Sequence, residues 1–403
     1  MADIVIRQLD SGVPKEMLTR YKDMGDGTHA EVVSVPGPFN VTLTDSAGVA
    51  NRIIDNKLHV SSMPYSYDIA EGNVSGHAPW TKIGYCPIGA TTETDIWSYG
   101  GTVATVPLIA TAATLKVRTN NAADAGTAIF TGTSDGGSTT SLVDSTKNFT
   151  AGTPVAAGDC VILDKAGATP EWGFVTAIPN ATTLTIGGGF SSGGTGAVRA
   201  YEVIDYSNQA GCHAVIIGGL SAAWAIQREI VVTGGAGPAD VTTGKTWLRV
   251  NSFRVIAAGA NSKPTGYVAL MDSGAIPATT YSYITAGYTR ARNSHYTVPA
   301  GKALFINELN IGYVGANANQ NCRIYTRASQ YSFESGGTPF LTRVSNGVNV
   351  WYPYSEVIES NSTVSIQIPQ PTRLLATCDI KMSAYASAAG VVVIAMRGWL
   401  EDV

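Results

Sequence analysis

Two short strings have the residue types of a nucleotide-binding or a catalytic loop. Residues 239–246 read Ala-Asp-Val-Thr-Thr-Gly-Lys-Thr, which satisfies a relaxed phosphate-loop pattern. A phosphate loop needs a helix directly after its lysine, because the backbone N–H groups of the first helical turn must face the phosphates. The following residues, Trp-Leu-Arg-Val at 247–250, instead alternate as a strand does. We therefore predict a hairpin loop and no nucleotide site.

The second string, residues 189–193, reads Gly-Phe-Ser-Ser-Gly and has the spacing of a serine nucleophile elbow. Such an elbow requires a strand before the serine, a helix after it, and an acid and a histidine downstream. The residues after Ser192 are Gly-Gly-Thr-Gly, which favour a flexible loop. We predict a glycine-rich junction here and no nucleophile.

The sequence lacks the residue spacings that a metal site or a catalytic pair of carboxylates would need. The histidines include no His-x-x-x-His or His-x-His pair that would seat a metal ion; they are His29, His59, His77, His213 and His295. Residues 23–28, Asp-Met-Gly-Asp-Gly-Thr, resemble the start of a calcium loop but lack its later carboxylates, so we predict an acidic turn between two strands. No motif selects a pair among the 30 acidic residues for sugar hydrolysis. The sequence therefore predicts no catalytic residue, no cofactor and no metal, and a protein that is not an enzyme.

Aromatic clusters are the remaining candidates for contact with a partner. Residues 350–354, Val-Trp-Tyr-Pro-Tyr, could stack on sugar rings, pack in a core, or anchor a subunit interface, since Trp and Tyr supply large contact areas at low entropic cost. Together with the acidic turn and one further tryptophan, they give the set of candidate interaction residues: Tyr21, Asp23, Asp26, Trp97, Trp351, Tyr352 and Tyr354.

Composition excludes several classes of protein. Charged residues make up 14% of the 403 residues and hydrophobic residues 44%, which excludes a charge-rich disordered chain and a coiled coil. The net charge is −4, with no basic surplus to neutralise a phosphate backbone, so nucleic acid is not an expected partner. The longest apolar run near the C-terminus, residues 391–396, is far shorter than the 18 or so residues of a spanning helix.

The N-terminal residues and the cysteines carry predictions about targeting and redox state. Asp3 and Arg7 interrupt the apolar stretch that a secretion signal would need, so we expect a soluble protein without such a signal. The five cysteines, odd in number and without a Cys-x-x-Cys pair, predict buried free thiols.

Short alternating runs, broken by Gly, Asn, Ser and Pro about every ten residues, predict an all-β protein. Such runs occur at residues 102–106, 114–118, 247–256 and 303–311. We expect two antiparallel β-sandwich domains of jelly-roll-like plan, an inserted small β-barrel and an extended N-terminal arm. The arm would cover residues 1–90, the first sandwich 91–275 with the barrel inserted at 131–197, and the second sandwich 276–403. The weakly patterned arm cannot bury a core alone and should order against the parent domain or a neighbouring subunit.

Several segments together resemble structural proteins of tailed-bacteriophage particles. They are residues 21–33, Tyr-Lys-Asp-Met-Gly-Asp-Gly-Thr-His-Ala-Glu-Val-Val, residues 95–101, residues 296–306, the barrel-like stretch at 142–149 and 158–162, and the ending at 378–403. The resemblance implies a non-enzymatic virion protein, made in the cytoplasm of the host bacterium, that forms a homo-oligomer with a trimer as the expected order. We expect it to decorate and stabilise the capsid shell as a cement protein through contacts with the major capsid protein. A neck, collar or tail accessory protein, or a fibre component that binds a host receptor or surface glycan, is the alternative.

Overall fold

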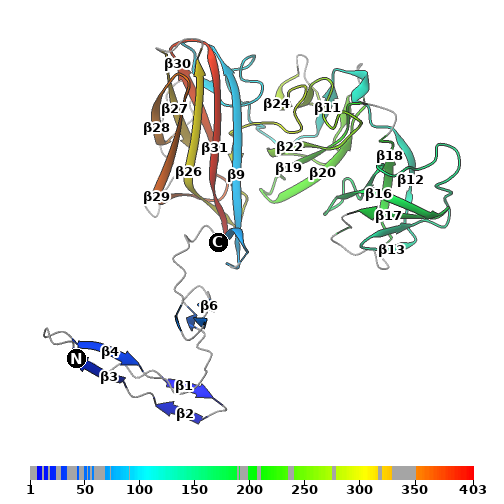
Figure 1. The fold of residues 1–403 in the computed structure, drawn as a ribbon. Coiled ribbons are helices and arrows are strands. Elements are labelled where there is room, and N and C mark those ends of the chain that lie inside the picture. The colour runs from blue at the N-terminus through cyan, green and yellow to red at the C-terminus, as the bar shows by residue number, and fades with distance from the viewer. Residues whose placement is uncertain are drawn as a thin grey trace. The chain divides into compact units, whose positions relative to one another are not determined.

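The computed structural model describes residues 7–10, 13–16, 19–23, 29–33, 43–44, 50–51, 53–54, 57–58, 69–72, 74–89, 91–187, 190, 198–206, 210–234, 240–274, 278–315, 320–328 and 351–403. Antiparallel strands form every sheet, as the alternating runs predict, so the all-β fold class is confirmed (Figure 1). The chain divides into two units, Met1–Ser75 and Gly76–Val403.

The described strands of the first unit are short hairpins. Each hairpin pairs two neighbouring strands, and none of these strands joins a larger sheet. The hairpins are β1 (Arg7–Asp10) with β2 (Val13–Glu16), β3 (Thr19–Asp23) with β4 (His29–Val33), β5 (Leu43–Thr44) with β6 (Ala50–Asn51), and β7 (Ile53–Ile54) with β8 (Lys57–Leu58). Asp23 pairs with His29 in the β3–β4 hairpin, and residues 24–28, where we predict the acidic turn, lie outside the described residues.

The second unit contains a sandwich near the C-terminus, here called the C-terminal sandwich. One sheet has the order β29 (Ser362–Leu374), β26 (Lys302–Gly315), β31 (Gly390–Asp402) and β9 (His77–Ile88). The other has the order β10 (Thr94–Asp95), β30 (Asp379–Ala386), β27 (Asn321–Ala328) and β28 (Trp351–Glu359), with β25 (Tyr296–Thr297) also on β30. Side chains from both sheets share one apolar core, which includes Ile311, Ile324 and Ile394.

A second pair of sheets forms the central sandwich. Its two sheets are β21 (Val241–Thr242), β11 (Leu115–Thr119), β23 (Val268–Asp272), β24 (Thr280–Ile284), and β20 (Ile226–Val232), β19 (Cys212–Leu220), β22 (Arg249–Ala258). Alternate residues of β11 are buried, and Leu115 and Val117 meet Val215 and Ile217 of β19 in a shared core. A short 3-10 helix, Ala122–Asp124, follows β11.

The insert is one curved sheet of seven strands around its own apolar core. Its order is β12 (Ala128–Thr133), β18 (Ala200–Ile204), β15 (Cys160–Leu163), β16 (Glu171–Asn180), β17 (Thr183–Gly187), β14 (Ser141–Val143) and β13 (Gly136–Ser138). A further cluster joins it to the central sandwich, because Ile162 and Ile204 of the insert pack with Ile216 and Ile230. All five cysteines are free and buried, as predicted.

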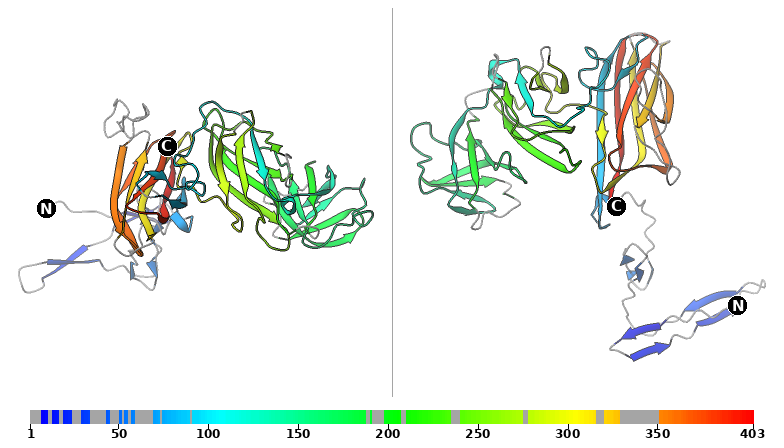
Figure 2. Two further views of the ribbon diagram at one scale, coloured as in Figure 1. Left: turned by 90° about the horizontal axis from the view of Figure 1, so that it is seen from above. Right: turned by 180° about the vertical axis from the view of Figure 1, so that it is seen from behind.

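The domain boundaries differ from those expected from sequence. Strand β9, which we assigned to the arm, pairs along its length with β31, so the C-terminal sandwich begins near residue 77 (Figure 2). Strand β10 pairs with β30 of the same sandwich instead of opening the first one. Strand β24, which we placed at the start of the second sandwich, belongs to the central one. Strand β12 pairs with β18, and β18 pairs with β15 of the insert. The insert therefore extends over residues 128–204.

One expected strand is absent. Residues 102–106 form turns in the structure. The backbone N–H of Val106 donates to the Asp95 carboxylate (2.7 Å), and the N–H of Val103 donates to the carbonyl of Tyr99. Turn and side-chain bonds, together with one bond from the N–H of Asp95 in β10 to the carbonyl of Ala104 (2.6 Å), thus satisfy this segment without a strand.

Candidate functional site: a cationic cleft in the second unit

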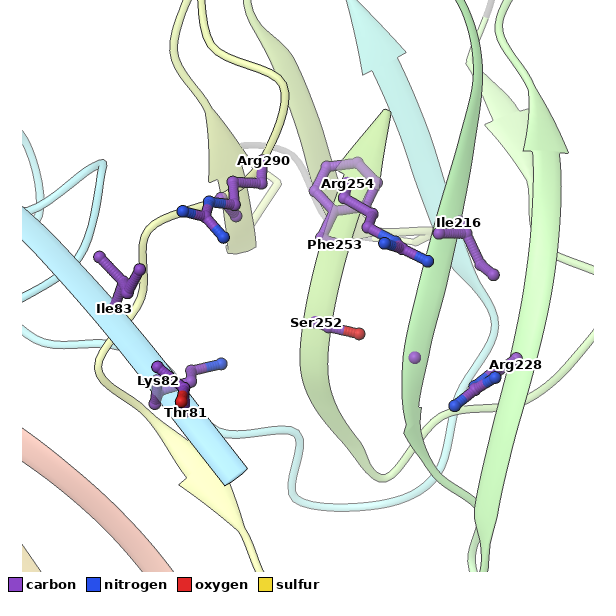
Figure 3. A pocket seen from close by; sticks show the side chains of 11 residues that line it. Thr81, Lys82, Ile83, Ile216, Arg228, Ser252, Phe253, Arg254 and Arg290 are labelled. Carbon is purple, nitrogen blue, oxygen red and sulfur yellow. The ribbon is translucent and has the colours of Figure 1, made fainter. Parts of the chain in front are cut away.

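A cleft opens between the outer face of the β20–β19–β22 sheet and strand β9 (Figure 3). Its floor is fixed by strand register. Gly218 of β19 lies between Arg228 of β20 and Ser252 of β22, and in the next row Ile216 pairs with Arg254. Because side chains of paired residues project from the same face, both arginines stand on the floor of the cleft.

Gly218 keeps this floor open. A Cβ atom at position 218 would lie 2.5 Å from the Ser252 hydroxyl oxygen, which is closer than atoms in real contacts approach. Any side chain here would occupy the space between Arg228 and Ser252. The glycine therefore leaves room for another group above the middle strand.

The walls come from segments distant in sequence. Thr81, Lys82 and Ile83 of β9 form one side, and Arg290 and Ala291 form another; the enclosed volume is about 380 Å³. Figure 3 shows Lys82 extending from β9 toward β22. Its ammonium group donates a hydrogen bond to the carbonyl of Asn251.

Positive charge dominates the lining of the cleft. Its charged residues are Lys82, Arg228, Arg254 and Arg290, and no carboxylate lines it. Burial lowers the pKa of Lys82 to about 7, because the charged ammonium loses hydration. Arg254 also lies over the ring of Trp172 from the insert, at 5.4 Å from the ring centroid. All three domains of the second unit thus contribute to the cleft or its border.

A buried polar network beside the cleft holds the two sandwiches together. Arg249 of β22 forms a bidentate pair with Asp379 of β30, with both N···O distances 2.9 Å. The Asp379 carboxylate also accepts a hydrogen bond from the Thr297 hydroxyl and lies 3.5 Å from His295 Nε2. Burial by itself would raise the pKa of Asp379, but hydrogen bonds from His295 and Arg249 hold it well below its usual value.

Asn251 adds a second connection at the same boundary. Its side-chain amide donates to the carbonyl of Thr297 (2.8 Å), and its oxygen accepts from the N–H of Thr297 (2.9 Å). Paired side-chain and backbone bonds of this kind fix orientation as well as distance. The spacing between β22 and the C-terminal sandwich, and with it the width of the cleft, is set by these contacts.

The described part of the phosphate-loop-like string, residues 240–246, contains no helix, as expected, but the predicted hairpin loop is wrong: the string includes β21, which pairs with β11, whereas the following strand β22 pairs with β19 in the other sheet. The Glu229 carboxylate accepts hydrogen bonds from the backbone N–H groups of Gly244 (2.6 Å) and Lys245 (3.0 Å). An internal carboxylate therefore occupies the donors that a phosphate would use. The Lys245 ammonium donates to the carbonyl of Gly167 in the insert (2.6 Å), so the loop joins the insert to the central sandwich.

The predicted interaction residues do not gather at the cleft. Trp97 is fully buried and its indole N–H donates to the carbonyl of Val103 (2.9 Å), so its ring packs inside the chain. Tyr21 and Asp23 lie in β3 of the first unit, and Asp26 lies outside the described residues. Trp351, Tyr352 and Tyr354 lie in β28, which pairs with β27. The serine string at 189–193 is largely outside the described residues.

Sequence reasoning did not find the basic residues of the cleft. Three of them lie in different strands and Arg290 lies between β24 and β25, with no common spacing, and only register brings Arg228 and Arg254 to one face. The available signal was modest: a basic residue at an outward position of an otherwise apolar strand. Within the described ranges, no three His, Cys, Asp or Glu side chains cluster as a metal site would, and no helix has the length and apolarity of a membrane span.

Comparison with known protein families, with curated proteins and with solved structures finds no match to this chain.

Proposed function

We propose that this chain is a non-enzymatic structural protein of a tailed-bacteriophage particle, which decorates and stabilises the capsid shell through contacts between subunits. The proposal rests on the sequence resemblance described above and on the division of the chain into hairpins and sandwiches. A neck, collar or tail accessory protein would use the same architecture.

The observation that carries the proposal is the set of isolated hairpins in the first unit. Each described strand between residues 7 and 58 pairs only with its hairpin partner among the described strands. A two-stranded hairpin is marginally stable in water, and its outer edges present unpaired N–H and C=O groups. Strand addition to a neighbouring subunit would satisfy those groups and order the arm. An arm of this kind suits a protein that assembles.

The second unit also supports this proposal, because its domains are held together. Its sandwiches and insert are joined by an apolar cluster around Ile216 and by the Arg249–Asp379 pair. Buried contacts at both boundaries favour a rigid block. A rigid unit that its arm attaches to a neighbouring subunit can stabilise a lattice of subunits.

Electron cryo-microscopy of the particle that carries this chain tests the proposal. We expect density for the two sandwiches and the insert at repeated positions on the shell, together with arm density paired to a neighbouring subunit. Density confined to the neck or tail would reject the capsid position. Absence of the chain from purified particles would reject a virion role altogether.

A second candidate function is host recognition, in which the chain is a fibre component that binds surface glycan. The cationic cleft favours it, because a basic cavity lined by exposed hydroxyls suits an acidic sugar. Binding of the purified protein to polysaccharide from the host surface is the corresponding measurement. Retention of neutral and acidic polysaccharide to the same extent would count against the cleft as the site.

A further inference from the structure

Four basic side chains share the cleft without a carboxylate to neutralise them. Among the described residues, none of the four forms an ion pair; they are Lys82, Arg228, Arg254 and Arg290. Basic residues elsewhere in the second unit do pair, for example Arg199 with Asp164 and Glu171. Arg228, Arg254 and Arg290 are exposed, so solvent weakens their mutual repulsion and leaves their guanidinium groups open to an anion.

Strand addition by a peptide does not explain the cleft. β22 is the last strand of its sheet, but its free edge is already used. The N–H of Ala291 donates to the carbonyl of Phe253 (2.9 Å), and the N–H of Val255 donates to the carbonyl of Thr289 (2.8 Å). The Lys82 ammonium takes the carbonyl of Asn251. An incoming strand would find no row of open backbone groups along β22, so recognition at the floor of the cleft comes from side chains.

Nucleotide bases are also unsuited to this cleft. Phe253, its one aromatic lining residue, is 1% exposed and offers no face for stacking. The ring of Trp172 at the border is in contact with Arg254. Base recognition depends on such stacking surfaces. The cleft instead offers guanidinium groups and the hydroxyls of Thr81 and Ser252, both on exposed residues.

We propose that the cleft is a binding site for a compact acidic sugar, such as a uronic acid or a sugar phosphate. The guanidinium groups of Arg228, Arg254 and Arg290 pair with its carboxylate or phosphate oxygens, because the planar fork of arginine matches both groups. Ser252 and Thr81 bond the sugar hydroxyls above the open floor at Gly218. The volume of about 380 Å³ lies within the usual range of small-ligand pockets, about 300–1,000 Å³.

Isothermal titration calorimetry on the full-length protein tests this proposal. The probes are digalacturonic acid, glucose 6-phosphate, neutral maltose and inorganic phosphate, all at one low ionic strength. We expect saturable binding of at least one acidic sugar, no binding of maltose, and an affinity for inorganic phosphate at least tenfold weaker than for the acidic sugar. Preference between the two acidic probes identifies carboxylate or phosphate as the recognised group. Binding should weaken as salt is added.

Charge-removal variants locate the site. The double variant Arg228→Gln/Arg290→Gln removes two cleft charges, and Lys263→Gln/Arg323→Gln removes two exposed charges outside the cleft lining. We expect the first to weaken acidic-sugar binding at least tenfold and the second to leave it within twofold. Without ligand, the cleft variant should melt at the same temperature or higher, because it relieves repulsion; a purely structural role would lower the melting temperature.

Several outcomes would overturn the assignment. They are no heat from either acidic probe at millimolar concentration, equal binding of maltose, equal binding of inorganic phosphate, or unchanged affinity in the cleft variant. The inference deepens the second candidate function, recognition of a surface glycan, by naming its ligand class; it does not rest on the capsid role, since binding by purified protein and position on a particle are separate measurements. Either can fail while the other holds.

Discussion

Lys82 illustrates how one residue of the cleft weakens the fold that contains it. Burial lowers the pKa of its ammonium from 10.5 to about 7. The unfolded chain therefore binds more protons than the folded chain between pH 7 and about pH 10, and stability must rise with pH across that window. At pH 7 and below, the folded protein carries the full unfavourable contribution of this group.

We expect Lys82→Met to stabilise the protein at pH 7 by about 1–3 kcal/mol, after allowance for the partial exposure of the side chain and for its lost bond to Asn251. The gain should shrink toward zero near pH 10, where the unfolded lysine also begins to lose its proton. Urea unfolding at the two pH values measures the difference. A destabilising effect at both would show that Lys82 is held by favourable contacts.

The same residue gives acidic-sugar binding a pH dependence. An anion stabilises the charged ammonium, so binding draws a proton to Lys82 and is tighter below pH 7. Two neighbouring groups have shifted pKa values of their own: the lowered pKa of Asp379 keeps its carboxylate ionised from pH 6 to 8.5, and burial lowers the pKa of His295. Arg249 and the three cleft arginines stay charged. We expect affinity for digalacturonic acid to be at least threefold higher at pH 6 than at pH 8.5 in calorimetry, and Lys82→Met to abolish that ratio.

Asp379 has the opposite role, because its charge joins two domains. Replacing it with Asn leaves Arg249 buried without its partner, and we expect a loss of about 3–5 kcal/mol at pH 7. A carboxylate with a lowered pKa contributes stability above its unfolded pKa of about 3.9, which is lost on further acidification. The difference between the parent protein and Asp379→Asn, followed by calorimetric melting, should therefore diminish below about pH 4.

A surface ion pair provides the control for that measurement. Lys302 and Asp402 pair on the surface, with the aspartate side chain 59% exposed. Because exposed pairs contribute about 1 kcal/mol or less, Asp402→Asn should change stability only slightly. Equal effects of the two substitutions would mean that the Asp379 network contributes no more than a solvent-exposed pair.

At the scale of elements, the close approach of β31 to β26 at the register shift depends on Gly398. The register of these strands shifts between Ile306 and Glu308, opposite Gly398. A Cβ atom at position 398 would lie 1.8 Å from the carbonyl oxygen of Phe305, which is rigid backbone. We expect Gly398→Ala to cost at least 2 kcal/mol, because the two strands must separate locally.

Gly101 is the matched control, since a Cβ atom there would make ordinary contact, 3.4 Å from the carbonyl oxygen of Pro87. Gly101→Ala should change the midpoint of urea unfolding little. If Gly398→Ala has the same small effect, the bulge can absorb a methyl group and the close approach is not a constraint.

Local pattern predicted individual strands far better than their partners. The alternation in residues 114–118 and 303–311 foretold β11 and β26, because a strand with one buried face must alternate. Pattern could not show that β9 pairs with β31, more than 300 residues later, since such pairing is chosen by the whole fold. The cleft was invisible for the same reason: its basic residues come from β9, β20, β22 and the segment around residue 290.

At the scale of the whole molecule, burial is concentrated in the second unit. The four apolar clusters of the described residues all lie between Trp80 and Met396, with their packed neighbours extending to Leu400. Strand β9, the first strand of the second unit, pairs from His77 to Ile88 with β31, the last strand of the same unit. Its stability therefore does not require the hairpins that precede it.

Deletion of residues 1–75 tests the arm directly. The cut falls at the boundary between the two units, before the first residue of β9. We expect the remaining chain to keep a β-sheet circular dichroism spectrum and a cooperative melt, because the four described apolar clusters are retained. We expect it to lose assembly with its partner subunits, measured by light scattering for self-association and by co-sedimentation with particles that lack this protein. Hairpins that are marginal alone become ordered by pairing with another subunit, so their removal should abolish attachment without unfolding the sandwiches.

Assembly at the level of the full chain would show that the contacts between subunits lie within residues 76–403, and would remove the arm from the proposed mechanism of attachment.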